Sequence, residues 1–416
     1  MQETAAVTRD EALALDAADP LARFREAFAL PQDVIYLDGN SLGPPPLSVH
    51  ERLAEVSRRE WGEGLVRSWN TADWIGAPTR VGDKIARLIG AAPGEVTVAD
   101  STTVNLFKLA AGACSLRPGR TTILSESGNF PTDLYAVQGL GALLEGRVRL
   151  KTVAPGELIA AIDEDTAAVV LTHVHYKTSR RWDLAAVTAA AQAKGALMVW
   201  DLCHSVGAVA VDLNGARADL AVGCSYKYLN GGPGAPAFLF VAARHQAAIR
   251  SPLTGWMGHA EPFAFEDGYR PAAGIRGQIT GTPPILGLTA LEAGVDLQLQ
   301  ADPALVEAKG LALAELFVAE ALARAGDADL ALTGPRDAAA RGLHVSFAHP
   351  QGYAVVQAMM ARGIVGDFRA PDIARFGFSP LFLSYAQVWD AADALAEVLA
   401  SRAWDQPRFH RRAAVT

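Results

Sequence analysis

Between about residues 95 and 242, short apolar segments alternate with alanine-rich segments that have the pattern of helices. The apolar segments are continuous runs rich in Val, Ile and Leu, which is typical of strands buried on both faces. Strands that alternate with helices form mostly parallel sheets, and ligands bind beyond the carboxyl ends of such strands. The predicted strands are 96–98, 122–124, 168–171, 197–200 and 238–240, and the predicted helices are 104–114, 131–140 and 184–194.

The pattern differs on either side of this α/β region. A proline-rich turn at 42–46 precedes a predicted helix at 47–61. Towards the C-terminus, a long helical pattern at 303–325 is followed by strand-like runs at 344–347 and 373–378, each with a helix after it. We therefore predict an N-terminal segment (1–60) that contributes to a small lobe, a large ligand-binding domain (61–290) and a small α+β C-terminal domain (291–416).

The composition excludes several classes of protein. The chain has 416 residues, 50% of them hydrophobic, and a net charge of -8 without a basic patch, so we expect no nucleic-acid partner. Its cysteines, Cys114, Cys203 and Cys224, form no C-x-x-C pair, which favours a reducing compartment over a disulfide framework. Residues 1–19 lack the features of a signal peptide, and no apolar run is long enough to span a bilayer. We expect a cytoplasmic protein with no membrane partner.

One lysine stands just after a predicted strand. The apolar run 219–224 is followed by Ser225, Tyr226 and Lys227, and then by a glycine-rich turn at 229–234. Because burial penalises an ammonium group, a lysine in this position favours the neutral amine, a nucleophile that forms Schiff bases with aldehydes. Pyridoxal 5'-phosphate (PLP) is the best-known aldehyde that proteins bind, so Lys227 is a candidate for this bond.

PLP also requires an anion beside its pyridine nitrogen. Asp201 directly follows the run 196–200, at the end of a predicted buried strand, where a carboxylate could keep that nitrogen protonated. An aspartate that only caps the next element is the alternative interpretation. The spacing to Lys227 and the nearby His204 favour the cofactor role, although His204 alone would more often be a core histidine.

A phosphate cradle and a flat partner for the ring complete the requirements. Hydroxyl groups cluster around Ser101 and Thr102, at the start of a predicted helix whose free N–H groups attract anions; a plain N-cap is the alternative. The chain has no Walker-type motif, which disfavours a nucleotide phosphate. Phe130 precedes a proline-initiated helix and could stack on the ring, or it could be a core residue.

Three further polar residues stand in apolar surroundings. Arg375 lies inside an apolar strand and needs a partner, either a substrate carboxylate or an internal salt bridge. His173 and His175 alternate at a strand end, but no carboxylate or cysteine completes a metal-ligand set at familiar spacing, so no metal site is expected.

Five segments together resemble bacterial kynureninase. The likeness extends from about residue 30 to the C-terminus, and the combination is specific although each segment alone is weak. It implies the fold type I architecture of PLP-dependent transferases: a mostly parallel seven-stranded sheet flanked by helices, and a smaller α+β C-terminal domain. It also implies a homodimer with active sites at the subunit interface. The segments are 36–43, 67–70, 129–135, 225–234 and 255–259.

The resemblance implies an activity and a role for each matching residue. The reaction would be hydrolysis of the Cβ–Cγ bond of L-kynurenine to anthranilate and L-alanine, in tryptophan catabolism and NAD biosynthesis. Two residues would be catalytic. Lys227 would form the Schiff base and also move the α-proton, and Tyr226 would contact the phosphate and donate a proton. The remaining cofactor residues would be Ser101, Thr102, Phe130, Pro131, Thr132, Asp133, Thr172, Asp201 and His204, with Trp256 and Thr282 from the neighbouring subunit.

Substrate binding is implied at four positions: Arg375, which would hold the amino-acid carboxylate, and Trp69, Tyr36 and Asn40. Trp69 and Thr282 match the bacterial pattern, which implies a preference for kynurenine over 3-hydroxykynurenine.

Four residues depart from the family pattern. Cys203 stands where Ala is expected and Ser101 where Thr is usual, both near the predicted site. His175 replaces Asn and Ser179 replaces Gly in a loop after a predicted strand, so we expect the backbone of that loop to differ from the family pattern.

Three rival functions share the cofactor. A cysteine desulfurase or selenocysteine lyase of the same fold needs a mobile, exposed cysteine, whereas Cys114 is predicted to be helical core and Cys203 and Cys224 to lie against the cofactor strands. An ordinary aminotransferase is the second rival. The third is a PLP-binding regulator, which usually carries a basic helix-turn-helix module that is not visible in this sequence.

Overall fold

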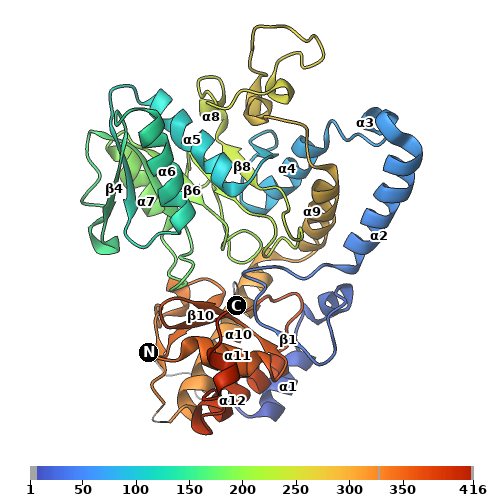
Figure 1. Cartoon of the computed structure of the whole chain (residues 1–416), viewed down its shortest axis with the longest axis vertical. Coiled ribbons are helices and arrows are strands. Elements are labelled where there is room, and N and C mark those ends of the chain that lie inside the picture. The colour runs from blue at the N-terminus through green and yellow to red at the C-terminus, as the bar shows by residue number, and fades with distance from the viewer. Residues whose placement is uncertain (1–6, 327, 414–416) are drawn as a thin grey trace.

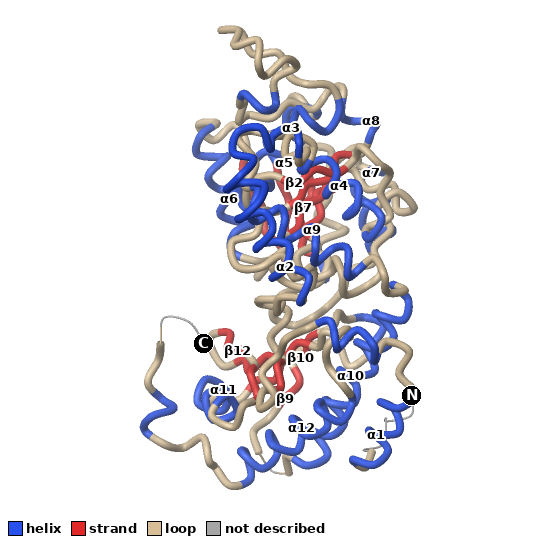
Figure 2. Tube along the Cα trace, turned by 90° about the vertical axis from the view of Figure 1, so that its right-hand side faces the viewer, coloured by secondary structure: helices blue, strands red, loops and turns tan. Residues whose placement is uncertain are grey.

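The computed structural model describes residues 7–326 and 328–413. Residues 1–6, part of the segment considered for a signal peptide, lie outside it. The described chain forms two lobes, a larger one built on one wide sheet and a smaller one built on a narrower sheet (Figure 2). Within the described ranges, no helix is long and apolar enough to cross a membrane.

The larger lobe contains a seven-stranded sheet with the order β2-β8-β7-β6-β5-β3-β4. Only β8 runs antiparallel to its neighbours; the remaining pairs are parallel, which confirms the predicted mostly parallel sheet. The strands are β2 (Val96–Val98), β3 (Thr122–Glu126), β4 (Arg149–Val153), β5 (Thr166–Thr172), β6 (Leu197–Asp201), β7 (Leu220–Gly223) and β8 (Phe238–Val241).

Helices cover both faces of this sheet. One apolar cluster joins α4, α7 and α9 to one face, and another joins α5 and α6 to the other. Successive residues of a strand enter opposite clusters, since side chains alternate across a sheet; this is why the buried strands are apolar throughout. The helices are α4 (Ala77–Leu88), α5 (Thr102–Leu116), α6 (Pro131–Leu143), α7 (Leu184–Ala193), α8 (Ala243–Gln246) and α9 (Ile285–Gln298).

The smaller lobe contains an antiparallel sheet with the order β12-β13-β10-β9. Its strands are β9 (Ala331–Leu332), β10 (His344–Ala348), β12 (Asp367–Arg369) and β13 (Ile373–Gly377). Its helices are α10 (Pro303–Arg324), α11 (Gly352–Met360) and α12 (Tyr385–Ala400). The predicted helix at 303–325 and strands at 344–347 and 373–378 are therefore confirmed.

The N-terminal part of the chain packs on the smaller lobe. Strand β1 (Ile35–Tyr36) pairs in parallel with β11 (Ile364–Val365), and α1 (Arg9–Ala17) packs against α12. From there α2 (Leu47–Glu55) continues as a π-helical segment (Val56–Gly64) to α3 (Ser68–Thr71), an arm along the outer side of α9 (Figure 1). Short 3-10 segments are Ala22–Ala27, Leu65–Arg67, Pro155–Glu157, Trp256–Gly258, Gly274–Gln278, Ala338–Ala340 and Pro407–His410.

Candidate active site

A cavity of about 200 Å³ opens beyond the carboxyl ends of β5, β6 and β7. This is where the strand pattern predicts a ligand site. The N-terminus of α5 and the loop before α6 complete its wall. Nine of the residues predicted to bind the cofactor line the cavity. Three further lining residues were not predicted to bind it. The lining residues are Ser101, Thr102, Thr103, Phe130, Thr132, Thr172, Tyr176, Asp201, Cys203, His204, Tyr226 and Lys227.

Lys227 lies in the loop after β7, where Nζ is 3.0 Å from Nε2 of His204. Burial, followed by the positive charge of Lys227, lowers the pKa of His204 well below its usual value. The imidazole is therefore neutral and accepts a hydrogen bond from the amine at Nε2. Its Nδ1 is buried and has no partner within residues 7–326 and 328–413.

Asp201 is the last residue of β6 and is 2% exposed. Its Oδ1 accepts a hydrogen bond of 2.7 Å from the backbone N–H of Cys203. This oxygen therefore has the capping contact of the alternative interpretation, and only the other oxygen, Oδ2, does not. Burial raises the pKa of Asp201, opposed by hydrogen bonds from Cys203 and by the charge of Lys227. A buried carboxylate thus faces the same cavity as the amine of Lys227, from the neighbouring strand.

Hydroxyl groups gather at the start of α5. Ser101 is its N-cap and accepts a hydrogen bond from the N–H of Val104 at 3.3 Å. Thr102 lines the cavity, and the hydroxyl of Thr103 lies 3.0 Å from that of Thr132. The end of a helix with free N–H groups and several hydroxyls is suited to hold a phosphate.

Phe130 lies at the mouth of the cavity rather than in the core, because 36% of its surface is exposed. Its ring meets that of Tyr176 edge-on, with centroids 5.1 Å apart. The side chain of Asn129 accepts a hydrogen bond from the N–H of Phe130 at 2.8 Å, and Thr172 donates one to Asn129. The loop that presents the aromatic ring is therefore tied to the end of β5.

Four predicted cofactor residues do not line this cavity. Pro131 and Asp133 are in the first turn of α6, where buried Asp133 accepts a hydrogen bond from Thr172 at 3.2 Å. Burial and the charge of Asp201 raise the pKa of Asp133 well above its usual value. Trp256 and Thr282 are exposed on the outer surface of the larger lobe.

The predicted substrate residues lie in different places. Trp69 packs edge-on against Trp74, with centroids 5.7 Å apart, on the arm that ends in α3 and outside the cavity of its own chain (Figure 1). Tyr36 donates a hydrogen bond of 2.8 Å to the carbonyl of Leu42. Asn40 is fully buried, and its side-chain atoms have no partner within the described part of the chain.

Arg375 is 1% exposed on β13 and pairs with the carboxylate of Asp367, as the salt-bridge interpretation requires. Its Nη1 also donates to the carbonyl of Tyr176 at 2.6 Å, which links the smaller lobe to the rim of the cavity. The arginine therefore lies beside the cavity, although a carboxylate of the chain already occupies one edge of its guanidinium.

His173 and His175 have partners other than a metal. Nδ1 of His173 lies 2.9 Å from the hydroxyl of Ser205, and Nε2 of His175 lies 2.8 Å from the carbonyl of Gly128. In the described ranges, no group of three or more histidine, cysteine, aspartate or glutamate side chains could hold a metal ion.

Sequence patterns did not identify all residues of the site. Thr103 belongs to the hydroxyl cluster recognised around Ser101 and Thr102. Cys203 was expected near the site, against the cofactor strands, but was given no role there. Tyr176, His344 and Asp367 were not expected there. His344 begins β10, and its ring lies 5.2 Å from that of His204, a contact between lobes that no local pattern reveals.

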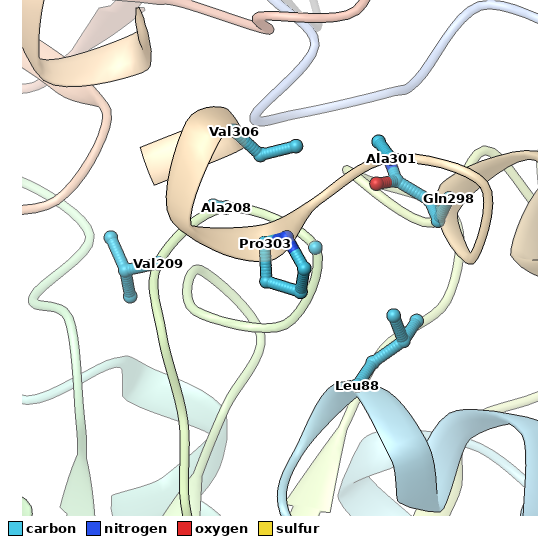
Figure 3. Close-up of a pocket in the computed structure, with 8 residues that line it drawn as sticks. Leu88, Ala208, Val209, Gln298, Ala301, Pro303 and Val306 are labelled. Carbon is cyan, nitrogen blue, oxygen red and sulfur yellow. The ribbon is translucent and has the colours of Figure 1, made fainter. Parts of the chain in front are cut away.

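A second cavity, between α9, α10 and the loop after β6, is too small to hold a cofactor (Figure 3). Its volume is about 20 Å³, enough for about one water molecule. Its walls are mainly apolar, and its polar side chain, Gln298, already donates a hydrogen bond to the carbonyl of Tyr228. It has neither the size nor the chemistry of a cofactor site.

The cavity beyond the carboxyl ends of β5, β6 and β7 fits PLP. It brings together an amine on Lys227, a buried carboxylate on Asp201, an aromatic ring on Phe130, and hydroxyls at a helix N-terminus. These are the four kinds of group that the cofactor requires. The unpartnered Nδ1 of His204 further indicates a site completed by a ligand.

Comparisons with known proteins agree with this chemistry. A family model described as kynureninase C-terminal domain matches residues 306–395. A kynureninase of Burkholderia pseudomallei (strain 1106a) is 51% identical over 414 residues, covering 98% of this chain and 100% of the relative. A kynureninase of Pseudomonas fluorescens is 49% identical over the same length, with the same coverage.

Solved structures show the same fold. A cysteine desulfurase from Thermococcus onnurineus NA1 superimposes with a TM-score of 0.78 at 19% identity, covering 91% of this chain and 98% of that one. A mutant of C-DES, with glycine covalently linked to its PLP cofactor, has a TM-score of 0.77 at 17% identity, covering 90% and 99%. At such identities the likeness shows the fold type I architecture and not a shared reaction.

Proposed function

The chain belongs to the kynureninase family, and we propose that it uses PLP to hydrolyse the Cβ–Cγ bond of L-kynurenine to anthranilate and L-alanine. One observation carries the proposal for this site: Lys227 and Asp201 face a single cavity from adjacent strand ends. The 51% identity to a kynureninase over nearly the whole chain supports the substrate.

PLP, when bound, supplies an electron sink for the bonds that break. The amine of Lys227 would bind its aldehyde, Asp201 would hold the proton of its pyridine nitrogen, and Phe130 would cover one face of its ring. The hydroxyls of Ser101 and Thr102, with the free N–H groups at the start of α5, would hold its phosphate.

Two side chains of the chain would move protons. Nζ of Lys227 would also take the α-proton of the substrate, and the neutral Nε2 of His204, 3.0 Å away, would orient this amine. Burial, followed by the neighbouring thiols of Cys224 and Cys203, raises the pKa of Tyr226. Its hydroxyl therefore keeps its proton at neutral pH and can donate it.

We further propose a homodimer in which Trp256, Thr282 and Trp69 serve the site of the neighbouring subunit. All three lie outside the cavity of their own chain, and Trp256 is 43% exposed. Phe263 and Phe265, near Trp256, are 61% and 78% exposed, which indicates a surface covered by a partner.

Mixing two inactive variants, Lys227→Ala and Trp256→Ala, tests this arrangement. If Trp256 acts in the neighbouring site, mixed dimers carry one intact site, and about one quarter of the wild-type activity should return. No recovery after verified subunit exchange would place Trp256 in the site of its own chain.

Other features follow from the same assignment. We propose a preference for kynurenine over 3-hydroxykynurenine, a cytoplasmic location, and a role in tryptophan catabolism that feeds NAD biosynthesis. We also propose the division into 1–60, 61–290 and 291–416, which the pairing of β1 with β11 and the separate apolar cluster of the smaller lobe support.

Fluorescence of anthranilate after addition of L-kynurenine to the PLP-loaded protein tests the reaction, with L-alanine released in equal amount. Sulfide release from cysteine, or faster exchange of alanine with 2-oxo acids, would instead identify a desulfurase or an aminotransferase. The cysteines disfavour a desulfurase, since Cys203 and Cys224 are buried and Cys114 is partly buried on α5.

A further inference from the structure

Two arginines of the hairpin β12–β13 share one carboxylate beside the active site. The register places Asp367 opposite Arg375. Oδ1 of Asp367 accepts a hydrogen bond from Nε of Arg375 at 2.8 Å, and Oδ2 accepts from Nη2 of Arg375 and, at 2.5 Å, from Nη2 of Arg369. Two guanidinium groups thus face one aspartate. The neighbouring Asp38, whose pKa is raised to about 7 by burial and by the charge of Asp367, is neutral below that pH, which leaves positive charge for an anionic ligand.

Arg375 has most of its N–H groups engaged. Besides the two nitrogens on Asp367, Nη2 donates to the hydroxyl of Ser41 at 2.8 Å and Nη1 to the carbonyl of Tyr176 at 2.6 Å. A guanidinium has five N–H groups, so one remains. Bidentate binding of a carboxylate needs two parallel N–H groups, and Arg375 cannot supply both in this arrangement.

Arg369 has free donors. Its Nη2 donates to Asp367 and, at 3.2 Å, to Ser41, but its buried Nε has no acceptor in the described part of the chain. A buried donor without a partner is costly, so the arrangement around this guanidinium is incomplete. Nη1 of Arg369 also has no partner in the described part of the chain and is not buried, and the side chain as a whole is 35% exposed, so a ligand can reach that end of the guanidinium.

The charge of Arg369 acts on the cavity itself. Burial raises the pKa of Tyr176, and the charges of Arg369 and Arg375 oppose this shift. Both arginines also contribute to the lowered pKa of His204, after burial, Lys227 and His344. Tyr176 and His204 line the cavity, so Arg369 lies within electrostatic reach of the cofactor site.

We propose that Arg369 is a second binding residue for the α-carboxylate of the substrate, and that Asp367 holds both arginines in position for it. Arg375 contributes its remaining N–H group, and Arg369 contributes the N–H groups of its Nη1. The inference rests on the proposed function, because it takes the substrate to be an α-amino acid. A purely structural role, in which Arg369 only neutralises Asp367, is the competing explanation.

Substitution of Arg369 distinguishes the two roles. In Arg369→Gln we expect KM for L-kynurenine to rise about 10- to 100-fold, the usual effect of losing a charge-assisted hydrogen bond, with a much smaller change in kcat. Arg369→Lys keeps the charge beside Asp367 but loses the planar donors, and should show an intermediate rise. The control Arg402→Gln removes an exposed arginine paired with Asp405 and should leave KM unchanged.

A binding measurement separates this inference from the reaction. Titration of the PLP-loaded protein with L-alanine and with L-alaninamide, followed by the change in visible absorption, reports on the carboxylate alone. Arg369→Gln should weaken L-alanine binding about 10- to 100-fold and leave L-alaninamide unchanged. Equal weakening of both, or of neither, would overturn the proposal. Failure of the wild-type protein to cleave L-kynurenine would contradict the proposed function. The comparison of L-alanine with L-alaninamide binding would still test the role of Arg369.

If Arg369→Gln loses PLP or unfolds, the binding measurement on Arg369→Lys alone tests the proposal. Selective weakening of L-alanine binding in that variant supports the proposal, and wild-type affinity for L-alanine contradicts it.

Discussion

Nζ of Lys227 lies 3.0 Å from Nε2 of His204, although the two residues follow different strands. His204 comes after β6 and Lys227 after β7, and these strands are neighbours in the sheet. Because the pKa of His204 is lowered by burial and by the lysine charge, the ring accepts a hydrogen bond without competing for the proton. The contact directs the amine into the cavity, where it can meet an aldehyde.

Replacement of this amine tests the cofactor bond. Lys227→Ala should lose the visible absorption of lysine-bound PLP, and anthranilate formation should fall by about 10²–10⁴-fold or more, because nucleophile and base are removed together. The control Lys194→Ala removes an exposed lysine paired with Glu164 and should behave like the wild type. Normal anthranilate production by Lys227→Ala would refute the assignment.

A glycine far away in the sequence supports the loop of Lys227. The N–H of Gly43 donates to the carbonyl of Tyr226 at 2.8 Å, and a Cβ on Gly43 would lie 2.1 Å from the carbonyl oxygen of Lys227. We expect Gly43→Ala to destabilise the protein by about 1–3 kcal/mol and to weaken PLP binding, as measured by thermal unfolding and cofactor titration.

Gly156→Ala is the matched control for this prediction, since a Cβ there meets no atom within 4 Å and the residue is exposed. If both variants bind PLP equally well, the loop of Lys227 does not depend on Gly43.

His344 is fully buried, and neither ring nitrogen has a partner in the described ranges. Burial lowers its pKa well below the usual value, so the ring is neutral. Unpaired buried polar groups cost about 1–3 kcal/mol each. We therefore expect His344→Phe to raise the free energy of unfolding, and turnover to fall because the ring borders His204 at the active site.

Urea unfolding and steady-state kinetics measure the two effects separately. His50→Phe, at an exposed position, serves as control and should change neither. A His344→Phe variant with full turnover would show that the unpaired nitrogens have no role in the reaction.

Arg369, Arg375 and Asp367 form a charged group, here called the arginine cluster, and Asp38 lies beside it. The net charge of this cluster together with Asp38 should depend on pH, because Asp38 titrates. Burial and the charge of Asp367 raise the pKa of Asp38 from 3.8 to about 7, while Arg375, a hydrogen bond with Ser41 and Arg369 oppose the shift. Below this pKa, Asp38 is neutral and the cluster carries one net positive charge; above it, the charges cancel. We expect KM for L-kynurenine to rise as pH increases through about 7.

Asp38→Asn should remove this dependence, because its amide stays neutral at every pH. The nearby hydroxyls of Tyr36 and Tyr228 do not titrate in this range, since burial raises the pKa of each. A KM that varies equally with pH in wild type and Asp38→Asn would exclude Asp38 as the source. The raised pKa also means that its contribution to stability falls as pH rises from about 4 to about 7.

Strand β4 and hairpin strand β12 show where prediction from sequence failed. In β4, Arg149 and Lys151 interrupt the apolar pattern, because an edge strand is partly exposed and carries charged residues. Strand β12 has only three residues, two of them charged, and is recognisable only through its pairing with β13. Arg369 and Asp367, which lie on β12 beside the substrate site, therefore had no recognisable local pattern, whereas Arg375 stood out in its apolar strand.

The sequence by itself determined the buried strands, the helices between them, and the candidate groups at the strand ends, above all Lys227 and Asp201. These features are local: a strand buried on both faces must be apolar throughout, and a charged residue that ends it is conspicuous. Only the tertiary structure decided which groups meet. The pairing of Lys227 with His204, of Arg375 with Asp367, and of His344 with His204 joins residues from different strands or lobes. Such contacts depend on the order of strands in the sheets and on how the lobes pack, which no local pattern encodes.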